Sequence, residues 1–354
     1  MRTDFRRNPV TNLTILMPVY NAMPYLPEAV DSIRRQTLRD WRFVILNDGS
    51  TDGTARYLDQ LNDPRIRVLH GPNVGLGPAL NRGLQLCTTE FLARMDGDDI
   101  AHPTRLEEQF ALLRRRPEVG LVGTQIERFG ETRTGSRSLL PCDHSSIVSH
   151  LMDGRAALYH PTVMCRTKLM KEIGGYMFDS AAQDWDMLLR MGERAELANL
   201  DRVLLSFRVH AGSVTVTKMA EAHSRIAFAC ECARRRQSAA PAIDYEEFMA
   251  ARRAAPFWRR AAEAVEVYAR RQYRLAVGEM LGSRPVLGRL RLAWAATCSP
   301  RLTRRRVFSV LHHRRPRWGR SPARTDAAVS SQSSGVRQSG LVDSCEKEQG
   351  FASQ

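Results

Sequence analysis

FLARMDGDD, the stretch at residues 91–99, decides the fold of this chain. Its apolar first half predicts a buried strand, and three carboxylates, those of Asp96, Asp98 and Asp99, follow where that strand ends. Gly97 allows the backbone to turn sharply between them. Closely packed carboxylates repel one another, and hard cations such as Mg2+ and Mn2+ bind through one or two carboxylates together with substrate phosphates. The stretch therefore indicates either a metal site at a strand end or a solvated acidic turn that caps the next helix.

Strands and helices alternate along the first part of the chain. Apolar runs at residues 13–17, 41–46, 66–69 and 119–123 predict further strands, and stretches with apolar residues at helical spacing separate them. This alternation predicts an α/β fold with a mostly parallel sheet that is covered by helices on both faces. Ligands of such sheets bind beyond the carboxyl ends of the strands.

Polar clusters follow three of the predicted strands, at residues 18–21, 47–52 and 96–99. Turn chemistry alone explains each cluster when it is taken by itself. If the three strands are neighbours, however, the clusters line one cleft at the carboxyl edge of the sheet. Their order along the chain therefore predicts a ligand site there.

The alternation becomes less regular after residue 123. Residues 160–166 and 203–207 predict two more strands, and the QDWD sequence at residues 183–186 begins a helix. From about residue 219 onward the chain is rich in Ala and Arg and has helical periodicity. We therefore expect helices alone in this last part.

The composition divides the chain into three parts. Residues 1–218 are predicted to form the α/β domain, residues 219–315 a basic helical extension, and residues 316–354 a disordered tail rich in Ser, Ala, Gln and Gly. The net charge of +15 is concentrated in residues 251–320, which contain 18 arginines, no lysine and three glutamates. The partner that the basic charge attracts must therefore meet this one segment.

Three interpretations of the arginine-rich segment at residues 251–320 are open. Apolar residues such as Leu290 and Trp294 interleave with arginine at helical spacing, which favours an anionic membrane surface as the partner. Nucleic acid, bound through counterion release, is the less favoured partner. The third interpretation is an ordinary helical subdomain with a solvated basic face.

Cysteine usage and the apolar runs indicate the compartment. The seven cysteines are odd in number and lack a paired spacing, which favours reduced thiols. The charged N-terminus leads directly into a strand, and no apolar run reaches the roughly 18 residues that span a bilayer. We expect a cytoplasmic protein that is at most peripheral on the inner face of the cell membrane.

Six motifs between residues 13 and 210 resemble those of the family 2 glycosyltransferases, which have the GT-A fold, a Rossmann-like sheet, and invert the configuration of the transferred sugar. In chain order the motifs are PVYN at 18–21, NDGSTDGT at 47–54, NVGL at 73–76 with NRG at 81–83, DGDD at 96–99, GGY at 174–176 and QDWD at 183–186. The resemblance covers somewhat over half of the chain. Asn47 and Gln183 stand where the family often has acidic residues.

The resemblance implies a role for individual residues. Asp98 would bind a divalent cation, Mn2+ or Mg2+, on the diphosphate of the donor, and Asp184 would be the catalytic base. The nucleotide would be held by Pro18, Tyr20, Asp48, Arg82 and Asp96. Second-tier candidates are His160 near the acceptor, Trp185 stacked on an acceptor sugar or packed in the core, and Arg208 and His210 near the diphosphate.

The implied reaction moves a sugar from a nucleoside-diphosphate donor, such as a UDP-sugar, to a saccharide or lipid-linked acceptor, as in the synthesis of cell-surface polysaccharide. A cation can neutralise the charge that develops on the leaving diphosphate. A carboxylate within hydrogen-bond reach can take the proton of the acceptor hydroxyl group. Whether a hexosyl or an N-acetylhexosaminyl group is moved depends on the loops between residues 127 and 159.

Other classes of protein fit the motifs less well. A dinucleotide-binding oxidoreductase needs G-x-G-x-x-G after the first strand, and the turn after residue 17 has no glycine. A nucleotidyltransferase would need a glycine-rich basic loop at the same place. Two alternatives remain, a non-catalytic nucleotide-sugar-binding protein of the same fold and a nucleic-acid-binding protein that uses the arginine-rich segment. Because both Asp98 and Asp184 are present, an enzyme is favoured.

Overall fold

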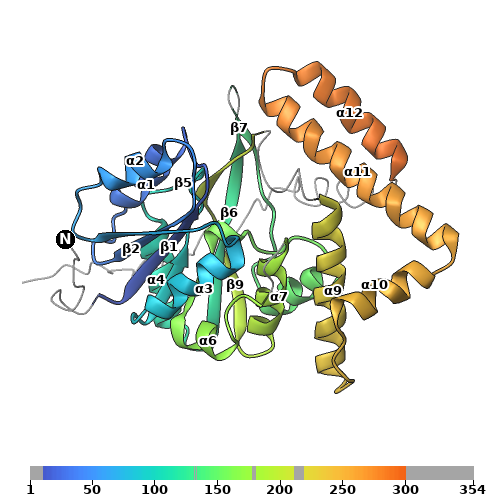
Figure 1. Cartoon of the computed structure of the whole chain (residues 1–354), viewed down its shortest axis with the longest axis horizontal. Coiled ribbons are helices and arrows are strands. Elements are labelled where there is room, and N and C mark those ends of the chain that lie inside the picture. Colours follow the sequence, from blue (N-terminus) through green and yellow to red (C-terminus); the bar gives the residue numbers. More distant parts are fainter. Residues whose placement is uncertain (1–10, 131, 133, 178–180, 211–218, 300–354) are drawn as a thin grey trace, which may run out of the picture. The chain divides into compact units, whose positions relative to one another are not determined.

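A computed structural model describes residues 11–130, 132, 134–177, 181–210 and 219–299 of the chain (Figure 1). The predicted disordered tail at residues 316–354 lies outside the described residues. The last residues of the predicted helical extension, 300–315, also lie outside them.

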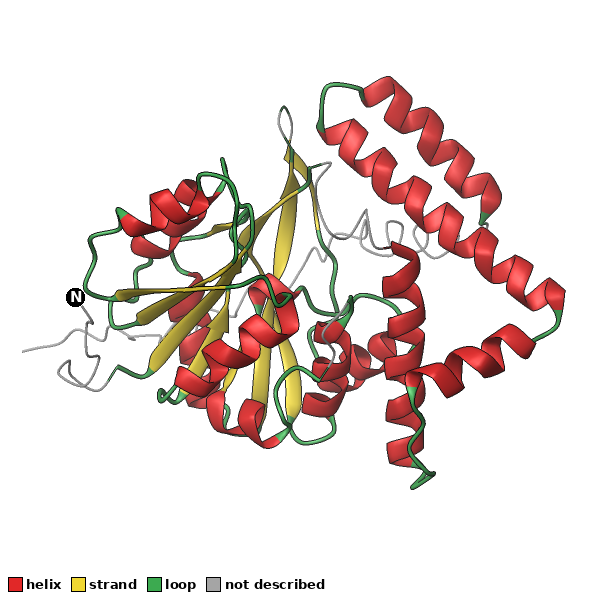
Figure 2. Cartoon of the chain, in the orientation of Figure 1, coloured by secondary structure: helices red, strands yellow, loops and turns green. Residues whose placement is uncertain are grey.

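One sheet of nine strands organises the described chain (Figure 2). Its strands follow the spatial order β3-β2-β1-β4-β8-β6-β9-β5, and β7 pairs with β6 outside this path. The strands are β1 (Leu13–Val19), β2 (Arg42–Asp48), β3 (Ile66–Gly71), β4 (Phe91–Arg94), β5 (Ile100–Ala101), β6 (Val119–Phe129), β7 (Thr134–Arg137), β8 (Met164–Arg166) and β9 (Glu196–Arg208).

Helices cover both faces of the sheet, as the sequence predicts. The α/β part contains α1 (Leu26–Arg34), α2 (Thr54–Asp59), α3 (Leu76–Leu86), α4 (Arg105–Arg115), α5 (His144–Met152), α6 (Thr167–Glu172) and α7 (Gln183–Gly192). Apolar residues of α1, α2 and α4 join one core with Ile15 and Met17 of β1. Those of α3, α5, α6 and α7 join a second core with Leu16 on the opposite face of β1. Both faces of β1 are therefore buried, which explains its continuous apolar run.

The direction of the strands changes across the sheet. The pairs β1–β2, β1–β4 and β2–β3 are parallel, as predicted. The short strand β8 lies between β4 and β6 and is antiparallel to both, so the sheet is mixed beyond β4. Parallel pairing resumes between β6 and β9.

The predicted strand at residues 160–166 is wrong in its first half. His160–Thr162 form a single 3-10 turn, and only Met164–Arg166 pair in the sheet. Pro161 lacks the backbone N–H that a central strand would use in its ladder. The prediction at 203–207 was too short, because β9 extends from Glu196 to Arg208.

The described chain after residue 218 is helical. It contains α9 (Met219–Gln237), α10 (Tyr245–Ala254), α11 (Phe257–Leu281) and α12 (Pro285–Cys298). Helices α11 and α12 lie side by side as an antiparallel pair (Figure 1). Among the described helices, none is long and apolar enough to cross a membrane.

Candidate active site

The first two polar clusters are bound to each other at the carboxyl ends of β1 and β2. The backbone N–H of Asn21 donates to Ser50 Oγ at 3.0 Å, and the N–H of Thr51 donates to Asn21 Oδ1 at 2.8 Å. Asn21 has a φ of 49°, a left-handed conformation that asparagine tolerates better than most residues. Because β1 and β2 are parallel neighbours, their ends meet at one edge of the sheet.

The third cluster lies at the end of β4, which pairs with the other side of β1. Carboxylate oxygens of Asp96, Asp98 and Asp99 all lie within 4.8 Å of one another. Burial raises the pKa of the Asp96 and Asp99 carboxyl groups, and the charge of Asp98 raises both further. One carboxylate oxygen of Asp99, Oδ2, is buried and has no hydrogen-bond partner among the described residues. A divalent cation would satisfy that oxygen and offset the repulsion, so the cluster fits such a cation.

Two residues at the end of β9 approach this acidic cluster from the other part of the chain. His210 Nε2 lies 3.1 Å from Asp98 Oδ2. The backbone N–H of Arg208 donates to Asp99 Oδ1 at 2.8 Å, and its Nε donates to the carbonyl oxygen of Asp98 at 2.8 Å. The guanidinium of Arg208 also pairs with Glu28 at 2.5 Å. Both second-tier candidates at this position therefore contact the cluster.

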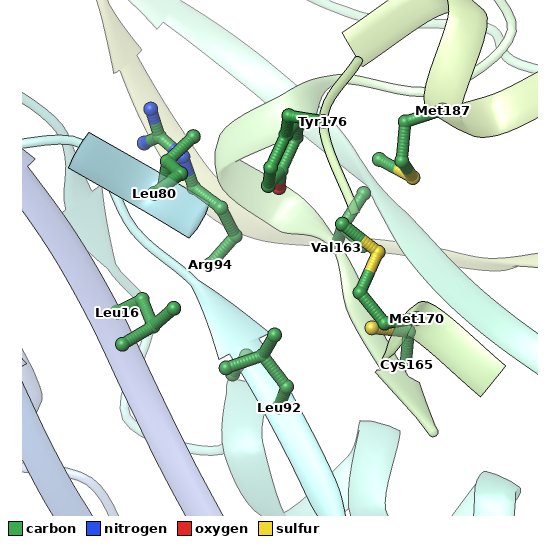
Figure 3. A pocket seen from close by; sticks show the side chains of 10 residues that line it. Leu16, Leu80, Leu92, Arg94, Val163, Cys165, Met170, Tyr176 and Met187 are labelled. Atoms are coloured by element: carbon green, nitrogen blue, oxygen red, sulfur yellow. The ribbon is translucent and has the colours of Figure 1, made fainter. Parts of the chain in front are cut away.

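Arg94 is a site residue that the sequence analysis missed. Its buried guanidinium forms an ion pair with Asp96, while its Nε has no hydrogen-bond partner among the described residues. The guanidinium lines a small pocket together with Leu80 of α3, Tyr176 and Met187 of α7 (Figure 3). An arginine inside an otherwise apolar strand was the available signal, because a buried charge needs a partner.

Asp184 lies at the start of α7, the helix that carries Met187 into the same pocket. Burial raises the pKa of the Asp184 carboxyl group, the charge of Asp96 raises it further, and the charge of Arg94 lowers it. The N-terminus of α7 favours the ionised form. The predicted base is therefore electrostatically linked to the acidic cluster.

The neighbours of Asp184 have structural contacts. Asp186 is buried in an ion pair with Arg190, with 2.6 Å between Asp186 Oδ2 and Arg190 Nη2. Trp185 is buried, and its Nε1 donates to the carbonyl oxygen of Leu151 at 3.1 Å. Of the two roles expected for Trp185, packing in the core is therefore the one that the structure has.

His160 is buried beside the pocket. Its Nε2 lies 2.8 Å from the hydroxyl oxygen of Tyr176. Burial lowers the pKa of His160 well below its usual value, so the ring is neutral at pH 7. Asn81 of α3 also holds Tyr176, through hydrogen bonds of 2.7 and 2.9 Å to its backbone. The NRG and GGY motifs, nearly a hundred residues apart, therefore meet here.

Of the residues predicted to hold the nucleotide, Pro18, Tyr20 and Asp48 lie at the ends of β1 and β2, Arg82 lies on α3, and Asp96 follows β4. Pro18 is buried in β1 and Tyr20 is half exposed just beyond it. Asp48 is 8% exposed, and its two carboxylate oxygens accept the backbone N–H groups of Val74 and Gly75, each at 2.9 Å. Arg82 donates to the carbonyl oxygen of His70. Asp48 thus fixes the loop before α3, a contact that its place in the motif did not reveal.

Comparison with known proteins identifies the family. Residues 14–174 match the family described as Glycosyl transferase family 2. The amylovoran biosynthesis glycosyltransferase AmsE of Erwinia amylovora is 32% identical over 213 residues, which cover 58% of this chain and 78% of AmsE. The chain is a family 2 glycosyltransferase. The EpsE protein of Bacillus subtilis is 31% identical over 188 residues, and the aligned region spans 51% of this glycosyltransferase and 66% of EpsE.

The fold of the glycosyltransferase is similar to that of solved structures. The crystal structure of S. aureus TarS 1–349 in complex with UDP-GlcNAc matches it with a TM-score of 0.51 at 16% sequence identity. The match covers 79% of this chain and 87% of the TarS chain. The expected α/β fold with helices on both faces of the sheet is confirmed.

Proposed function

We propose that this glycosyltransferase moves a sugar from a nucleoside-diphosphate donor to an acceptor hydroxyl group, with a divalent cation at the acidic cluster and inversion at the sugar carbon. The observation that carries the proposal is the convergence of Asp96, Asp98 and Asp99 within 4.8 Å at the carboxyl edge of the sheet. The buried Asp99 oxygen without a partner adds to it.

Asp98 would hold the cation together with Asp99, whose buried Oδ2 has no partner among the described residues. His210, 3.1 Å from Asp98, would complete the set of donors, and Asp96 would face the nucleotide. Carboxylate oxygens suit Mg2+ and Mn2+. When bound, the cation would supply a positive charge to the leaving diphosphate. Arg208 keeps the cluster in place, because its Nε and backbone N–H donate to Asp98 and Asp99.

Asp184 is the base in this proposal. Its carboxylate takes the proton of the acceptor hydroxyl group while the acceptor oxygen bonds to the sugar carbon and the bond to the diphosphate oxygen breaks. A single displacement of this kind inverts the configuration. Burial of Asp184 raises its pKa and so makes the carboxylate a stronger base than one in water.

Pro18, Tyr20, Asp48 and Arg82 would form the nucleotide side of the site. Tyr20 offers an exposed ring at the end of β1, and Asp48 fixes the loop at Val74 and Gly75. We propose a UDP-sugar as the donor, supported by the shared fold of TarS in its complex with UDP-GlcNAc. The name of AmsE supports a role in polysaccharide synthesis.

We also propose that the acceptor is a saccharide or a lipid-linked saccharide, and that residues 251–320 hold the enzyme on the inner face of the membrane. The support is the concentration of the net charge in this segment. Removal of the segment from residue 251 onward is expected to abolish sedimentation with anionic vesicles. Equal sedimentation of the full and the shortened chain would contradict the proposal.

The experiment that tests the catalytic proposal is a panel of UDP-, GDP- and TDP-sugars with Mn2+, Mg2+ or a chelator. We expect nucleotide release from one donor class, and only when the metal is present. A binding protein of the same fold would bind nucleotide and release no product from any donor. Metal-independent turnover would contradict the role of the acidic cluster.

A further inference from the structure

The hairpin of α11 and α12 is held together along its length by polar contacts. Trp294 Nε1 lies 3.2 Å from the hydroxyl oxygen of Tyr268. Arg291 Nη1 donates to Gln272 Oε1 at 2.7 Å, and Ser299 Oγ lies 2.5 Å from Glu266. These contacts fix which sides of the two helices face the same way.

One side of this hairpin is apolar and exposed. On α11, residues 257, 268 and 275 fall on one helical stripe, and on α12 residues 287, 290 and 294 fall on another, because their spacings are those of one helix face. The hydrogen bond between Tyr268 and Trp294 joins the two stripes. The exposed members are Phe257 (74%), Tyr268 (44%), Leu287 (40%), Leu290 (66%) and Trp294 (56%). We call these five residues the apolar face.

The opposite side of α11 is charged and turned toward the rest of the extension. Residues 259, 263, 266 and 270 form this polar stripe at the same helical spacing. Glu263 lies 3.6 Å from His223 Nε2 of α9, and Glu266 pairs with Arg270 at 2.9 Å. On α11 the apolar face therefore points away from α9.

Two arginines border the apolar face along one edge. Arg260 and Arg271 each follow an aromatic residue of the face, Phe257 and Tyr268, by three positions. Neither arginine has a carboxylate partner among the described residues, and both are exposed. The glutamate closest in sequence to the α12 part of the face, Glu279, already pairs with Arg291 at 2.9 Å. The edge is therefore positively charged without internal compensation.

We propose that the apolar face docks on an anionic lipid surface, with Phe257, Leu290 and Trp294 entering the head-group region and Arg260 and Arg271 contacting lipid phosphates. Tryptophan and tyrosine favour the membrane interface, and arginine beside an apolar stripe is typical of helices that lie in its plane. A second copy docked through the same apolar face would bring only uncharged side chains of that face, and no carboxylate among them for the two arginines. A nucleic acid backbone would leave the exposed leucines without a partner. The inference rests on the proposed membrane location and assigns it to one surface.

Vesicle sedimentation of the full chain tests this surface. The probes are vesicles of phosphatidylglycerol with phosphatidylcholine and vesicles of phosphatidylcholine alone, at low and high salt. Arg260→Gln/Arg271→Gln is expected to weaken binding to the anionic vesicles by about 25-fold, since each arginine contributes on the order of a fivefold change. Leu290→Gln/Trp294→Gln is expected to weaken binding at both salt concentrations.

Matched variants elsewhere control for net charge and apolar area. Arg35→Gln/Arg115→Gln removes two exposed arginines at the C-terminal ends of α1 and α4. Leu86→Gln/Leu139→Gln removes two leucines that are 43% and 44% exposed. Both control variants are expected to bind as the unaltered chain does. Donor turnover without acceptor confirms that every variant is folded.

Each contrary outcome has its own meaning. If the full chain binds anionic vesicles and the face variants bind equally well, the proposal that the apolar face binds lipid is wrong, while the proposed membrane location stands. If the full chain binds no vesicles, both the docking of the apolar face and the membrane location are wrong. A face variant that changes the oligomeric state in solution, with no vesicle binding by the full chain, would assign the face to a second copy instead.

Discussion

Asp184 and Asp186, two positions apart on α7, should lose different properties when each is changed to asparagine. Asp186 is buried in an ion pair with Arg190, whose side chain also donates to the carbonyl oxygen of Gly175 at 2.7 Å. Asp184 is partly exposed, has no ion-pair partner among the described residues, and is linked to the acidic cluster through its electrostatic effect. We therefore expect Asp186 to be needed for stability and Asp184 for catalysis.

The expected losses follow from these contacts. Asp186→Asn leaves the Arg190 charge buried and uncompensated, which costs about 3–5 kcal/mol of stability. The pKa of Asp184 is raised by burial, so its ionised form disfavours the folded state at neutral pH. Asp184→Asn should therefore leave the free energy of unfolding unchanged or raise it, and the difference should vanish at a pH low enough to protonate Asp184 in the folded and the unfolded chain.

The assay pairs urea unfolding with donor binding and turnover. Asp184→Asn should keep donor binding and lower transfer by a factor on the order of 10² to 10⁴, the usual contribution of a general base. Asp186→Asn should unfold at a lower urea concentration. If Asp184→Asn loses stability or donor binding instead, Asp184 is structural. If Asp186→Asn is stable but inactive, the base is Asp186.

Three further variants test other parts of the site, and a pH profile tests Asp184 again. Asp98→Asn should abolish metal-dependent turnover, because an amide is a weaker ligand for a hard cation, and full activity in Mn2+ or Mg2+ would remove the metal role. Asp48→Ala should raise the donor KM and spare kcat, since it releases the loop at Val74 and Gly75; a collapsed kcat at unchanged KM would contradict this. Arg94→Met should lower the free energy of unfolding by about 3 kcal/mol, because it leaves Asp96, whose side chain is 31% exposed, without its ion-pair partner. Adding Asp96→Asn should recover part of this loss in urea unfolding. If the effects of the two changes simply add, the pairing is refuted. The acid limb of kcat/KM should lie above the ordinary carboxyl range, because the raised pKa of Asp184 leaves the base protonated to a higher pH; a limb in the ordinary range would point to another base.

The elements of the first half, and its acidic cluster, could be predicted from the sequence because both are local. The continuous apolar run of β1 predicts a strand buried on both faces. The DGDD motif follows β4, another short apolar run that predicts a buried strand. Helix α7 likewise begins at Gln183, where the QDWD motif predicts a helix.

The parts that sequence could not predict depend on long-range pairing. Nothing in the local pattern places β8 between β4 and β6, or brings His210 to Asp98 from 112 residues away. The burial of Trp185 and the pairing of Arg94 with Asp96 also follow from neighbours that the fold supplies. The functional roles of these residues remain predictions, which the variants above test.

The metal site at the acidic cluster is tested most directly by a calorimetric titration of UDP with and without Mn2+, on the unaltered chain and on Asp98→Asn. We expect Mn2+ to strengthen UDP binding to the unaltered chain, and Asp98→Asn to lose this dependence while weak metal-free binding persists. UDP binding that is the same with and without Mn2+ in the unaltered chain would contradict a metal site at the acidic cluster.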